Sequence, residues 1–481
     1  MEAWLNDAGA VGLPHLKVAD FALTGRGVQA QRAFSAGERI LTIPAQCLWT
    51  VEHAYADRLL GPVLRALQPP LSVEDTLALH ILLVRARPRP RPDGDGAYEA
   101  GRRSHVDVLP GRYTMSIFFS DEEMQVCKGS SLYTLTTQLR GRIGDDYKKL
   151  LTRVLMRHRS LFPLSKFGIE DYKWALCTVW SRGMDFTVSE GNSLRLLAPF
   201  ADMLNHSSDV KQCHAYDPTT GDLSILASKD YNVGDQVFIY YGPVPNNRLL
   251  RLYGFVLPEN PHDSYHLVLQ TSPMAPLYEQ KERLWKLAGL DTACTIPLTV
   301  NDPLPRSVLR YLRIQRLDES LLGAMTMQIA TGADEKISDD SETLILQFLI
   351  DSISAILESF SIPLDILTAQ LAAGDVYPMG SNAWAAAQVS VGEQRILRLA
   401  RDKAERLLSA VGGGGDHGDA QRRRNRCARC GKEEEEEAAT ATRLMACGRC
   451  KAVWYCGREC QVGHFKEHKA LCRSLAAKKV K

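Results

Sequence analysis

The strongest constraint on the fold of this chain is a group of cysteines near its C-terminal end. Seven of the twelve cysteines lie between residues 427 and 472, where they form four short pairs with one histidine: C-x2-C, C-x2-C, C-x3-C and H-x3-C. Zinc takes four thiolate or imidazole ligands in a tetrahedron, and a short pair on a tight turn supplies two of them. The spacing therefore predicts two zinc ions, held by Cys427, Cys430, Cys447, Cys450, Cys456, Cys460, His468 and Cys472.

A disulfide cluster is the alternative for the same segment, and it fits poorly with seven cysteines and an aligned histidine. The stretch MEAWLNDAGAVGLP has no basic region followed by an apolar core, so we expect no secretory signal and a reducing compartment. A segment this small buries too little apolar surface to fold alone, and metal binding would supply the folding energy. The remaining cysteines are expected to be unpaired core thiols: Cys47, Cys127, Cys177, Cys213 and Cys294.

The order of the ligands, with YC-x3-C-Q before HKALC, resembles the MYND zinc finger. The resemblance implies that the first pair joins the third and the second joins the fourth. One zinc would then take Cys427, Cys430, Cys456 and Cys460, and the other Cys447, Cys450, His468 and Cys472. His464 matches no family ligand and is expected to be structural. The family implies a module that binds a protein partner, often through short proline-containing peptides. The spacer KEEEEEAATATR is longer than usual and is expected to be a solvated loop.

Composition and linkers limit the classes of partner. The net charge of +2 gives no global field toward nucleic acid or membrane. No run approaches the ~18 to 20 apolar residues of a membrane span. VGGGGDHGDA (411–420) predicts a flexible linker and QRRRNR (421–426) a short basic cluster. We expect no membrane, no direct nucleic-acid binding, and a location in the cytoplasm, the nucleus or both.

Periodicity predicts a mixed body before the linker. Apolar spacing indicates helices over 73–86, 145–162, 170–186 and 392–411, and RARPRPRPDGDG (85–96) indicates a surface loop. Residues 223–242 read as a hairpin-like pair of short strands around YNVGD, and residues 25–44 have the same character around Gly37 and Glu38. The fold class is therefore α+β, followed by an all-α lobe from about 275 to 410.

Three stretches of this body could carry chemistry: GRG (25–27), ADMLNHS (201–207) and IYYGPVPNNRLLRLYGF (239–255). Each is weak alone, because tight turns need glycine anyway and NHS or YYG is usually a turn or packing. In this order, with Ser181–Arg182 between them, they resemble the SET domain of protein methyltransferases, in the branch of the Rubisco large-subunit methyltransferase. The resemblance implies a SET domain over 1–270 with a helical insertion at about 50–170, and a helical substrate-binding lobe over 275–410.

The resemblance also implies roles for named residues around the cofactor S-adenosylmethionine. Arg182 would pair with the cofactor's carboxylate, Asn205 would bond its amino-acid end, and the backbone of His206 would lie near its adenine. Asp202 would hold that loop, and the turn Gly25–Arg26–Gly27 would bring the backbone close. The catalytic residues would be Tyr241, where the methyl group crosses, and Tyr253, which would wall the lysine channel. Strand alternation places Tyr240 on the opposite face, in the core.

The implied function is protein-lysine N-methyl transfer to a protein substrate, with the finger recruiting a partner. One branch member methylates a histidine of actin, and there the second tyrosine block lacks its tyrosine. RLYGFV keeps Tyr253, which favours lysine, while SRGMDF (181–186) leaves histidine open. A scaffold without activity is a further alternative, against which the intact Arg182, Asn205, His206 and Tyr241 argue. Histone-directed control is less favoured, because the finger follows the catalytic body instead of interrupting it.

Overall fold

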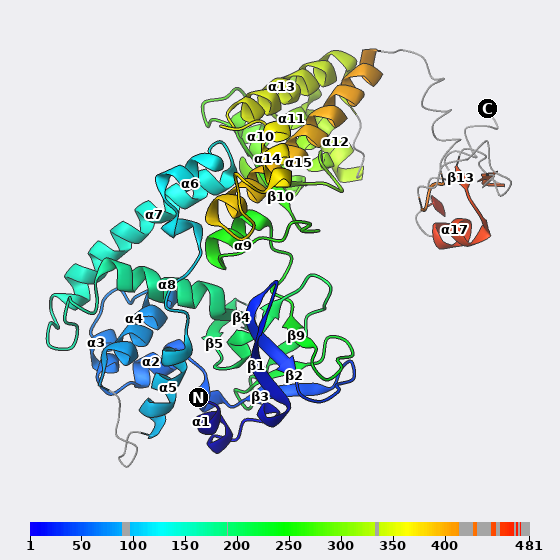
Figure 1. Ribbon diagram of the computed structural model, residues 1–481. Helices are drawn as coiled ribbons and strands as arrows, with labels where there is room; N and C mark the ends of the chain where they lie inside the picture. The colour runs from blue at the N-terminus through cyan, green and yellow to red at the C-terminus, as the bar shows by residue number, and fades with distance from the viewer. Residues whose placement is uncertain are drawn as a thin grey trace. The chain divides into compact units, whose positions relative to one another are not determined.

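The computed structural model describes residues 1–88, 97–189, 191–331, 336–412, 427–430, 444–448, 453–465, 468–469 and 472. The chain divides into two compact units: residues 1–337 with 344–405, and residues 338–343 with 406–481. Most of the predicted linker (413–426), the acidic spacer and part of the predicted surface loop (89–96) lie outside the described residues. The predicted α+β class is confirmed (Figure 1).

Helices fill the predicted insertion of the first unit. The prediction over 73–86 is confirmed, because a helix spans Val73–Ala86. The Ser72 hydroxyl caps it by accepting a hydrogen bond from the backbone N–H of Asp75 at 3.0 Å. Its apolar residues are buried almost all round, so it forms the centre of a helical cluster. The insertion holds α2 (Val51–Ala56), α3 (Leu60–Arg65), α4 (Val73–Ala86), α5 (Ala97–Val108), α6 (Asp121–Val126) and α7 (Ser131–Leu150). The helix α1 (Glu2–Asp7) precedes it and α8 (Ile169–Arg182) follows it.

Two predicted helices end earlier than expected. Over 145–162, α7 ends at Leu150, one π-helical turn follows to Leu155, and the chain then leaves the helix. Over 170–186, α8 ends at Arg182 because Gly183 turns into a strand. A Cβ atom at Gly183 would lie 2.4 Å from the carbonyl oxygen of Val179, so the chain can make this turn only at a glycine.

Short strands form the rest of the predicted SET region. One sheet has the order β1 (Leu16–Phe21), β2 (Gly25–Ala30), β9 (Gln236–Ile239), β6 (Asn205–His206). A second has the order β3 (Arg39–Ile43), β8 (Leu223–Leu226), β7 (His214–Tyr216), and β4 (Gly183–Ser189) pairs with β5 (Asn192–Leu197). Their inward side chains make a core separate from the helical one, with Leu41, Ile43, Phe200, Leu223 and Val237 fully or almost fully buried.

The two expected hairpins are wrong. β2 does not pair with β3, nor β8 with β9; instead β2 pairs with β9 and β3 pairs with β8. Between them, Phe34 and Tyr231 exchange backbone hydrogen bonds of 2.9 Å. Residues 25–43 and 223–239 therefore run antiparallel to each other along their length. Alternation shows that a segment is a strand, but it carries no information about which distant strand is its partner.

The following lobe is mainly helical as predicted, but it is not all-α, because β11 (Ala293–Thr299) lies within it and pairs with β10 (Ser264–Gln270). In the predicted apolar stripe of 392–411, Ile396, Leu397, Ala400 and Ala404 are fully buried. The helix α9 (Asn246–Leu252) precedes this lobe. The helices of the lobe are α10 (Tyr278–Leu287), α11 (Arg306–Gln315), α12 (Leu322–Thr331), α13 (Asp339–Glu358), α14 (Leu364–Ala373) and α15 (Asn382–Gly412).

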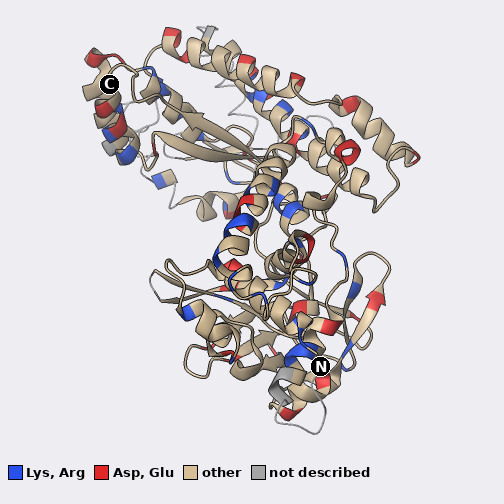
Figure 2. Cartoon of the chain, turned by 90° about the vertical axis from the view of Figure 1, so that its left-hand side faces the viewer, with Lys and Arg blue, Asp and Glu red and all other residues tan. Residues whose placement is uncertain are grey.

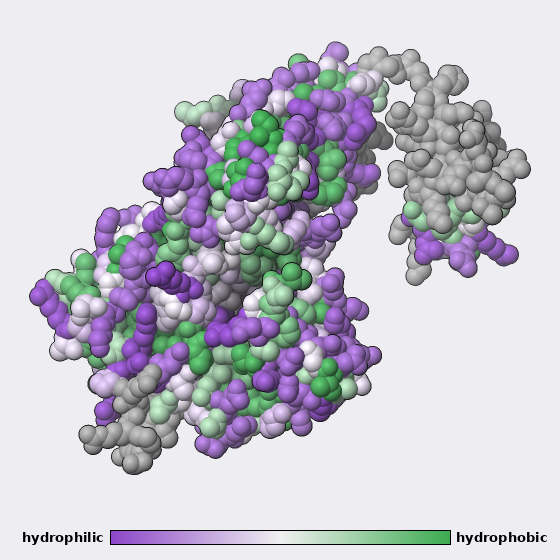
Figure 3. All heavy atoms as spheres, in the orientation of Figure 1, coloured by the Kyte–Doolittle hydropathy of each residue, from purple (hydrophilic) through white to green (hydrophobic). Residues whose placement is uncertain are grey.

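The surface agrees with the low net charge. Acidic and basic residues are interspersed along the helices (Figure 2). The face in Figure 3 is mostly hydrophilic, with small apolar patches between polar ones. Within the part of the chain that the structure describes, no helix is both long enough and apolar enough to span a bilayer.

A buried carboxyl group joins α15 to α7 and α9. Glu393 is 1% exposed, and its carboxylate accepts hydrogen bonds from the backbone N–H of Ser131 at 2.7 Å and from the Asn247 amide at 3.3 Å. The Ser131 hydroxyl donates to it as well. Burial raises the pKa of Glu393 to about 7, although these bonds oppose the shift.

Glu393 should therefore make stability depend on pH. Its pKa is raised from 4.5 to about 7, so the folded chain binds a proton that the unfolded chain has lost, and stability falls as pH rises through this window. A shift of this size corresponds to at most about 3 kcal/mol. We expect urea unfolding to give a lower stability at pH 8 than at pH 5 for the wild type, and a smaller difference for Glu393→Gln. Equal pH dependence in the two proteins would contradict this role.

Candidate functional site

A pocket of about 170 Å³ opens where α8 meets β4 and where the chain leaves β9. Four of the predicted site residues line it: Arg182, Asp202, Tyr241 and Tyr253. The other five predicted residues of this region, Gly25, Arg26, Gly27, Asn205 and His206, stand beside it on β2 and β6, which both pair with β9.

Parallel pairing of β6 with β9 brings the NH pair to the tyrosines. Asn205 faces Phe238 and His206 faces Ile239 in the register. The backbone N–H of Tyr241 donates to Nδ1 of His206 at 3.1 Å, and the two rings stack with centroids 5.1 Å apart. Burial lowers the pKa of His206 and favours the neutral ring that this bond requires. The His206 side chain thus fixes the position of Tyr241.

Asn205 ties the same loop to the GRG strand. Its amide nitrogen donates to the carbonyl oxygens of Arg26 at 3.1 Å and Thr24 at 3.4 Å. A Cβ atom at Gly27 would lie 2.9 Å from that nitrogen and 2.4 Å from Nε2 of Gln236. A side chain at position 27 would therefore displace the amide ends of Asn205 and Gln236. With both amide hydrogens used, Oδ1 of Asn205 is the atom left to face a ligand.

A buried charge pair forms the wall of the pocket. Nη1 of Arg182 donates to the backbone oxygen of Asp202 at 2.8 Å and lies 3.4 Å from its carboxylate Oδ2. The Asp202 side chain is fully buried. Burial alone would raise its pKa, but His105 and Arg182 outweigh burial and hold the pKa below its ordinary value. Asp202 is therefore ionised and keeps Arg182 in place, as an anchor for a carboxylate would need.

Two residues of this network were missed by the sequence analysis. His105, on α5, places Nε2 2.9 Å from Oδ2 of Asp202, and the indole N–H of Trp49 donates to its Nδ1 at 3.0 Å. An indole can only donate, so Nδ1 must accept and the ring proton sits on Nε2, directed at Asp202. No spacing pattern links these residues, because they lie far apart in sequence and meet only through the fold.

The two predicted catalytic tyrosines lie together. Their ring centroids are 5.2 Å apart, and the Tyr241 hydroxyl donates to the carbonyl oxygen of Leu204 at 2.8 Å. Burial raises the pKa of both Tyr241 and Tyr253, so both stay neutral phenols. Since the Tyr241 proton is directed at Leu204, the lone pairs of its oxygen are left to accept bonds from a reacting group.

The expectation for Tyr240 is wrong. Tyr240 is half-buried, borders the same pocket as Tyr241, and its hydroxyl lies 3.0 Å from Nε2 of His262. β9 ends at Ile239, so the strict alternation that would have sent Tyr240 into the core no longer applies there.

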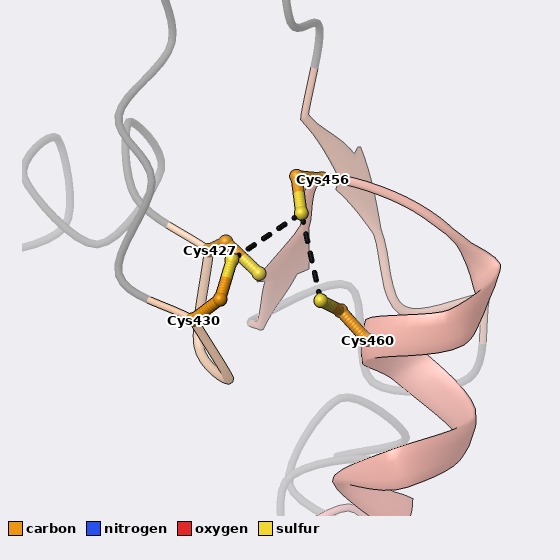
Figure 4. A group of neighbouring side chains, drawn as sticks. All are labelled: Cys427, Cys430, Cys456 and Cys460. Atoms are coloured by element: carbon orange, nitrogen blue, oxygen red, sulfur yellow. Dashed lines mark hydrogen bonds between the residues drawn. The ribbon is translucent and has the colours of Figure 1, made fainter. Parts of the chain in front are cut away.

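Four cysteines predicted for one zinc converge in the second unit (Figure 4). The sulfur atoms of Cys427, Cys430, Cys456 and Cys460 lie within 4.8 Å of one another, although they come from two separate segments, 427–430 and 453–465. Cys456 is 3.4 Å from Cys430 and 3.5 Å from Cys460, sulfur to sulfur. Two ligands of one zinc, each about 2.3 Å from the metal, stand at comparable separations.

A second group contains Cys447, His468 and Cys472, with ligand atoms again within 4.8 Å. Nε2 of His468 lies 3.4 Å from the sulfur of Cys447. Cys450, the fourth predicted ligand, lies outside the described residues. His464 belongs to neither group, and its Nδ1 is 3.1 Å from the Tyr455 hydroxyl, which fits a structural role. The thiolate and imidazole donors suit zinc, and the two groups follow the implied pairing.

Family models match three parts of the chain: the SET domain over residues 25–242, the Rubisco LSMT substrate-binding domain over 272–397, and the MYND finger over 427–472. The solved "Structure of Rubisco LSMT bound to AdoMet" has a TM-score of 0.72 at 22% identity, covering 87% of this chain and 97% of that one. A second, of the LSMT SET domain "bound to Lysine and AdoHcy", gives 0.70 at 23% identity, covering 87% and 96%.

Curated relatives are actin-histidine N-methyltransferases. The protein of Mus musculus is 27% identical over 415 residues, 82% of this chain and 66% of the relative. That of Homo sapiens is 26% identical over the same length and the same shares. The match thus spans about two thirds of the length of these relatives.

The chain therefore has the fold of the solved Rubisco LSMT structures. Along its length it matches the models of a SET domain, a Rubisco LSMT substrate-binding domain and a MYND finger, in this order. Arg182, held by Asp202, offers a guanidinium that suits the carboxylate of S-adenosylmethionine, and the two cysteine groups offer donors that suit zinc.

Removing the imidazole of His105 should weaken the cofactor site. His105→Ala leaves the buried Asp202 carboxylate without its Nε2 donor, which should cost about 2 kcal/mol of unfolding free energy. Because Arg182 is held by Asp202, the Kd for S-adenosylmethionine should also rise, as measured by titration calorimetry. The exposed His15→Ala variant is the matched control and should change neither value. A stable His105→Ala protein with unchanged affinity would contradict the role of this network.

Zinc content should report the two ligand groups separately. Full-length protein should hold two zinc ions by mass spectrometry of the metal, because two separate groups of donors are present. Cys456→Ser removes one group and should lower the content toward one, whereas Cys294→Ser, outside the finger, should keep both. A wild-type protein that holds fewer than two would count against the assignment.

Proposed function

We propose that this protein is an S-adenosylmethionine-dependent protein-lysine N-methyltransferase whose MYND finger recruits a protein partner. The observation that carries the proposal is the Tyr241–Tyr253 pair beside the Arg182–Asp202 anchor in one pocket. The pocket has the parts that methyl transfer needs, namely a cationic anchor, an oriented phenol and aromatic walls. The predicted ligands of the finger are thiolates and one imidazole, four for each zinc. No coordination position is left for a substrate, which suits partner binding more than catalysis.

S-adenosylmethionine, when bound, supplies a methyl group on a positively charged sulfur. The guanidinium of Arg182 would hold the cofactor's carboxylate, and Oδ1 of Asn205 would accept from its amino group. The aromatic walls of Tyr241 and Tyr253 would exclude water from the lysine, which lowers the pKa of its ammonium and favours the neutral amine. The Tyr241 oxygen would accept a hydrogen bond from that amine and aim its lone pair at the methyl carbon.

A second candidate is protein-histidine methylation. The curated relatives named above are actin-histidine N-methyltransferases. The pocket also has a polar side, where Nε2 of Gln212 lies 3.0 Å from Nε2 of His214, which could orient an imidazole. Against this, Tyr253 narrows the pocket with an aromatic ring next to Tyr241. The lysine reading is therefore the first proposal.

A ligand for the MYND finger and a location in the cell are also proposed. A short proline-containing peptide on the partner is the proposed ligand of the MYND finger. Zinc held by thiolates is stable in a reducing environment, so the proposed location is the cytoplasm, the nucleus or both.

Substitution Tyr241→Phe tests the proposal. We expect wild-type protein with methyl-labelled S-adenosylmethionine to label lysine in proteins of a cell lysate. Loss of the oriented hydroxyl should lower the rate by about a hundredfold. Tyr216→Phe, outside the pocket, should keep the rate. Label on histidine would replace the first proposal with the second, and no label from a folded protein that still binds the cofactor would indicate a scaffold.

A further inference from the structure

A groove lies beside the pocket, between α7 and α9. It consists of two adjoining hollows of about 430 and 660 Å³. Both are lined by Leu135 and Gln138 of α7 and by Arg248 and Arg251 of α9. The larger hollow extends under β10 to Tyr265 and Val268. The groove therefore joins the helical insertion to the substrate-binding lobe within one unit.

Three arginines converge on this groove: Arg142 and Arg248, which are exposed, and Arg251, which is half-buried. No ion pair among the described residues involves any of them. Nε of Arg251 is buried and has no hydrogen-bond partner within the described part of the chain. Burial lowers the pKa of Arg251, and Arg248 and Arg142 lower it further, which indicates repulsion without a counter-charge.

The buried carboxyl group of Glu393 forms no described ion pair with these arginines. It lies behind Ser131 and Asn247, which both line the larger hollow, and it accepts their hydrogen bonds. Cations without a counter-charge attract an anion more strongly in a confined groove than in bulk water, because the dielectric constant of the groove is lower.

The groove and the pocket are lined by neighbouring residues of the chain. Leu252 lines the groove and the next residue, Tyr253, lines the pocket. Pro243 and Pro245, which line the groove, follow Tyr241 by two and four residues. The charge of Arg248 also acts on the Tyr253 hydroxyl, where it opposes the effect of burial on the pKa. A ligand in the groove would thus extend from the residue being methylated.

We infer that this groove binds an acidic segment of the protein substrate, adjacent to the residue that is methylated. The inference rests on the proposed function. Carboxylates of the segment pair with Arg142, Arg248 and Arg251, and its apolar side chains contact the lining residues Leu135 and Leu252. Nucleic acid fits less well, because three cations in a partly apolar groove lack the extended basic stripe that a phosphate backbone requires.

Direct binding tests the groove independently of catalysis. Fluorescent peptides carrying one lysine next to a tract of glutamates would be compared with the same peptides carrying glutamines. Anisotropy would be measured with the full-length protein and no cofactor. We expect the glutamate peptide to bind about tenfold more tightly, as two or three charge pairs would give. The preference should shrink as salt rises.

Charge reversal in the groove is the decisive comparison. Arg248→Glu with Arg251→Glu should abolish the preference for the glutamate peptide, and the exposed Arg142→Glu should reduce it. Arg395→Glu makes the same charge change at an exposed position of α15 outside the groove and should keep the preference. Circular dichroism and cofactor binding check that the variants fold, and Arg142→Glu alone keeps the test valid if the double variant does not.

Three results would overturn the inference: equal binding of the two peptides by the wild type, loss of the preference in Arg395→Glu, or groove variants that lose an RNA oligonucleotide but keep the peptide preference. A protein that binds the acidic peptide but methylates nothing would instead refute the proposed function and leave the groove intact.

Discussion

The buried carboxylate of Asp202 is the group on which the site depends. Removing an isolated carboxylate from water costs several kcal/mol unless partners compensate it. Its compensation comes from Arg182 at the end of α8 and from His105 on α5, whose tautomer is set by Trp49. Three distant segments must therefore be in place before Asp202 can be buried as an ion. The helical insertion thus supports the pocket directly.

The position of Asp202 also determines where the residues that follow it in the chain lie. The 3-10 turn at Ala201–Met203 leads into Asn205 and His206, which pair with β9 in parallel. Asn205 reaches across to the backbone of Arg26, and His206 accepts from the Tyr241 backbone. Both ends of the SET region are therefore tied to one short loop. A displacement of Asp202 would reach the GRG strand and Tyr241 together.

The sequence could predict those parts of the structure that local chemistry determines. The helix over 73–86, the apolar stripe of α15 and the short ligand pairs follow from spacing within a few turns of chain. The pairing of residues 25–43 with 223–239 depends on contacts between distant segments. Local alternation does not reveal such contacts, and for this reason the two expected hairpins are wrong. His105 and Trp49 stand in no recognisable sequence motif. A lone histidine on a helix is usually structural, so its position alone does not indicate a role in the site. Tyr240 was misplaced because its strand ends one residue before it.

The choice between lysine and histidine as the methyl acceptor depends on how the pocket affects the protonation of each side chain. A lysine reaches the pocket as an ammonium and must lose a proton, so apolar and aromatic walls help by lowering its pKa. An imidazole is already neutral near pH 7 and gains little from the same walls; it needs polar groups that orient its reactive nitrogen. Tyr253, whose ring lies tilted against that of Tyr241, supplies the first kind of environment, and Gln212 with His214 supplies the second. The tyrosine pair stands next to the Arg182–Asp202 anchor, which is the physical ground for placing lysine first.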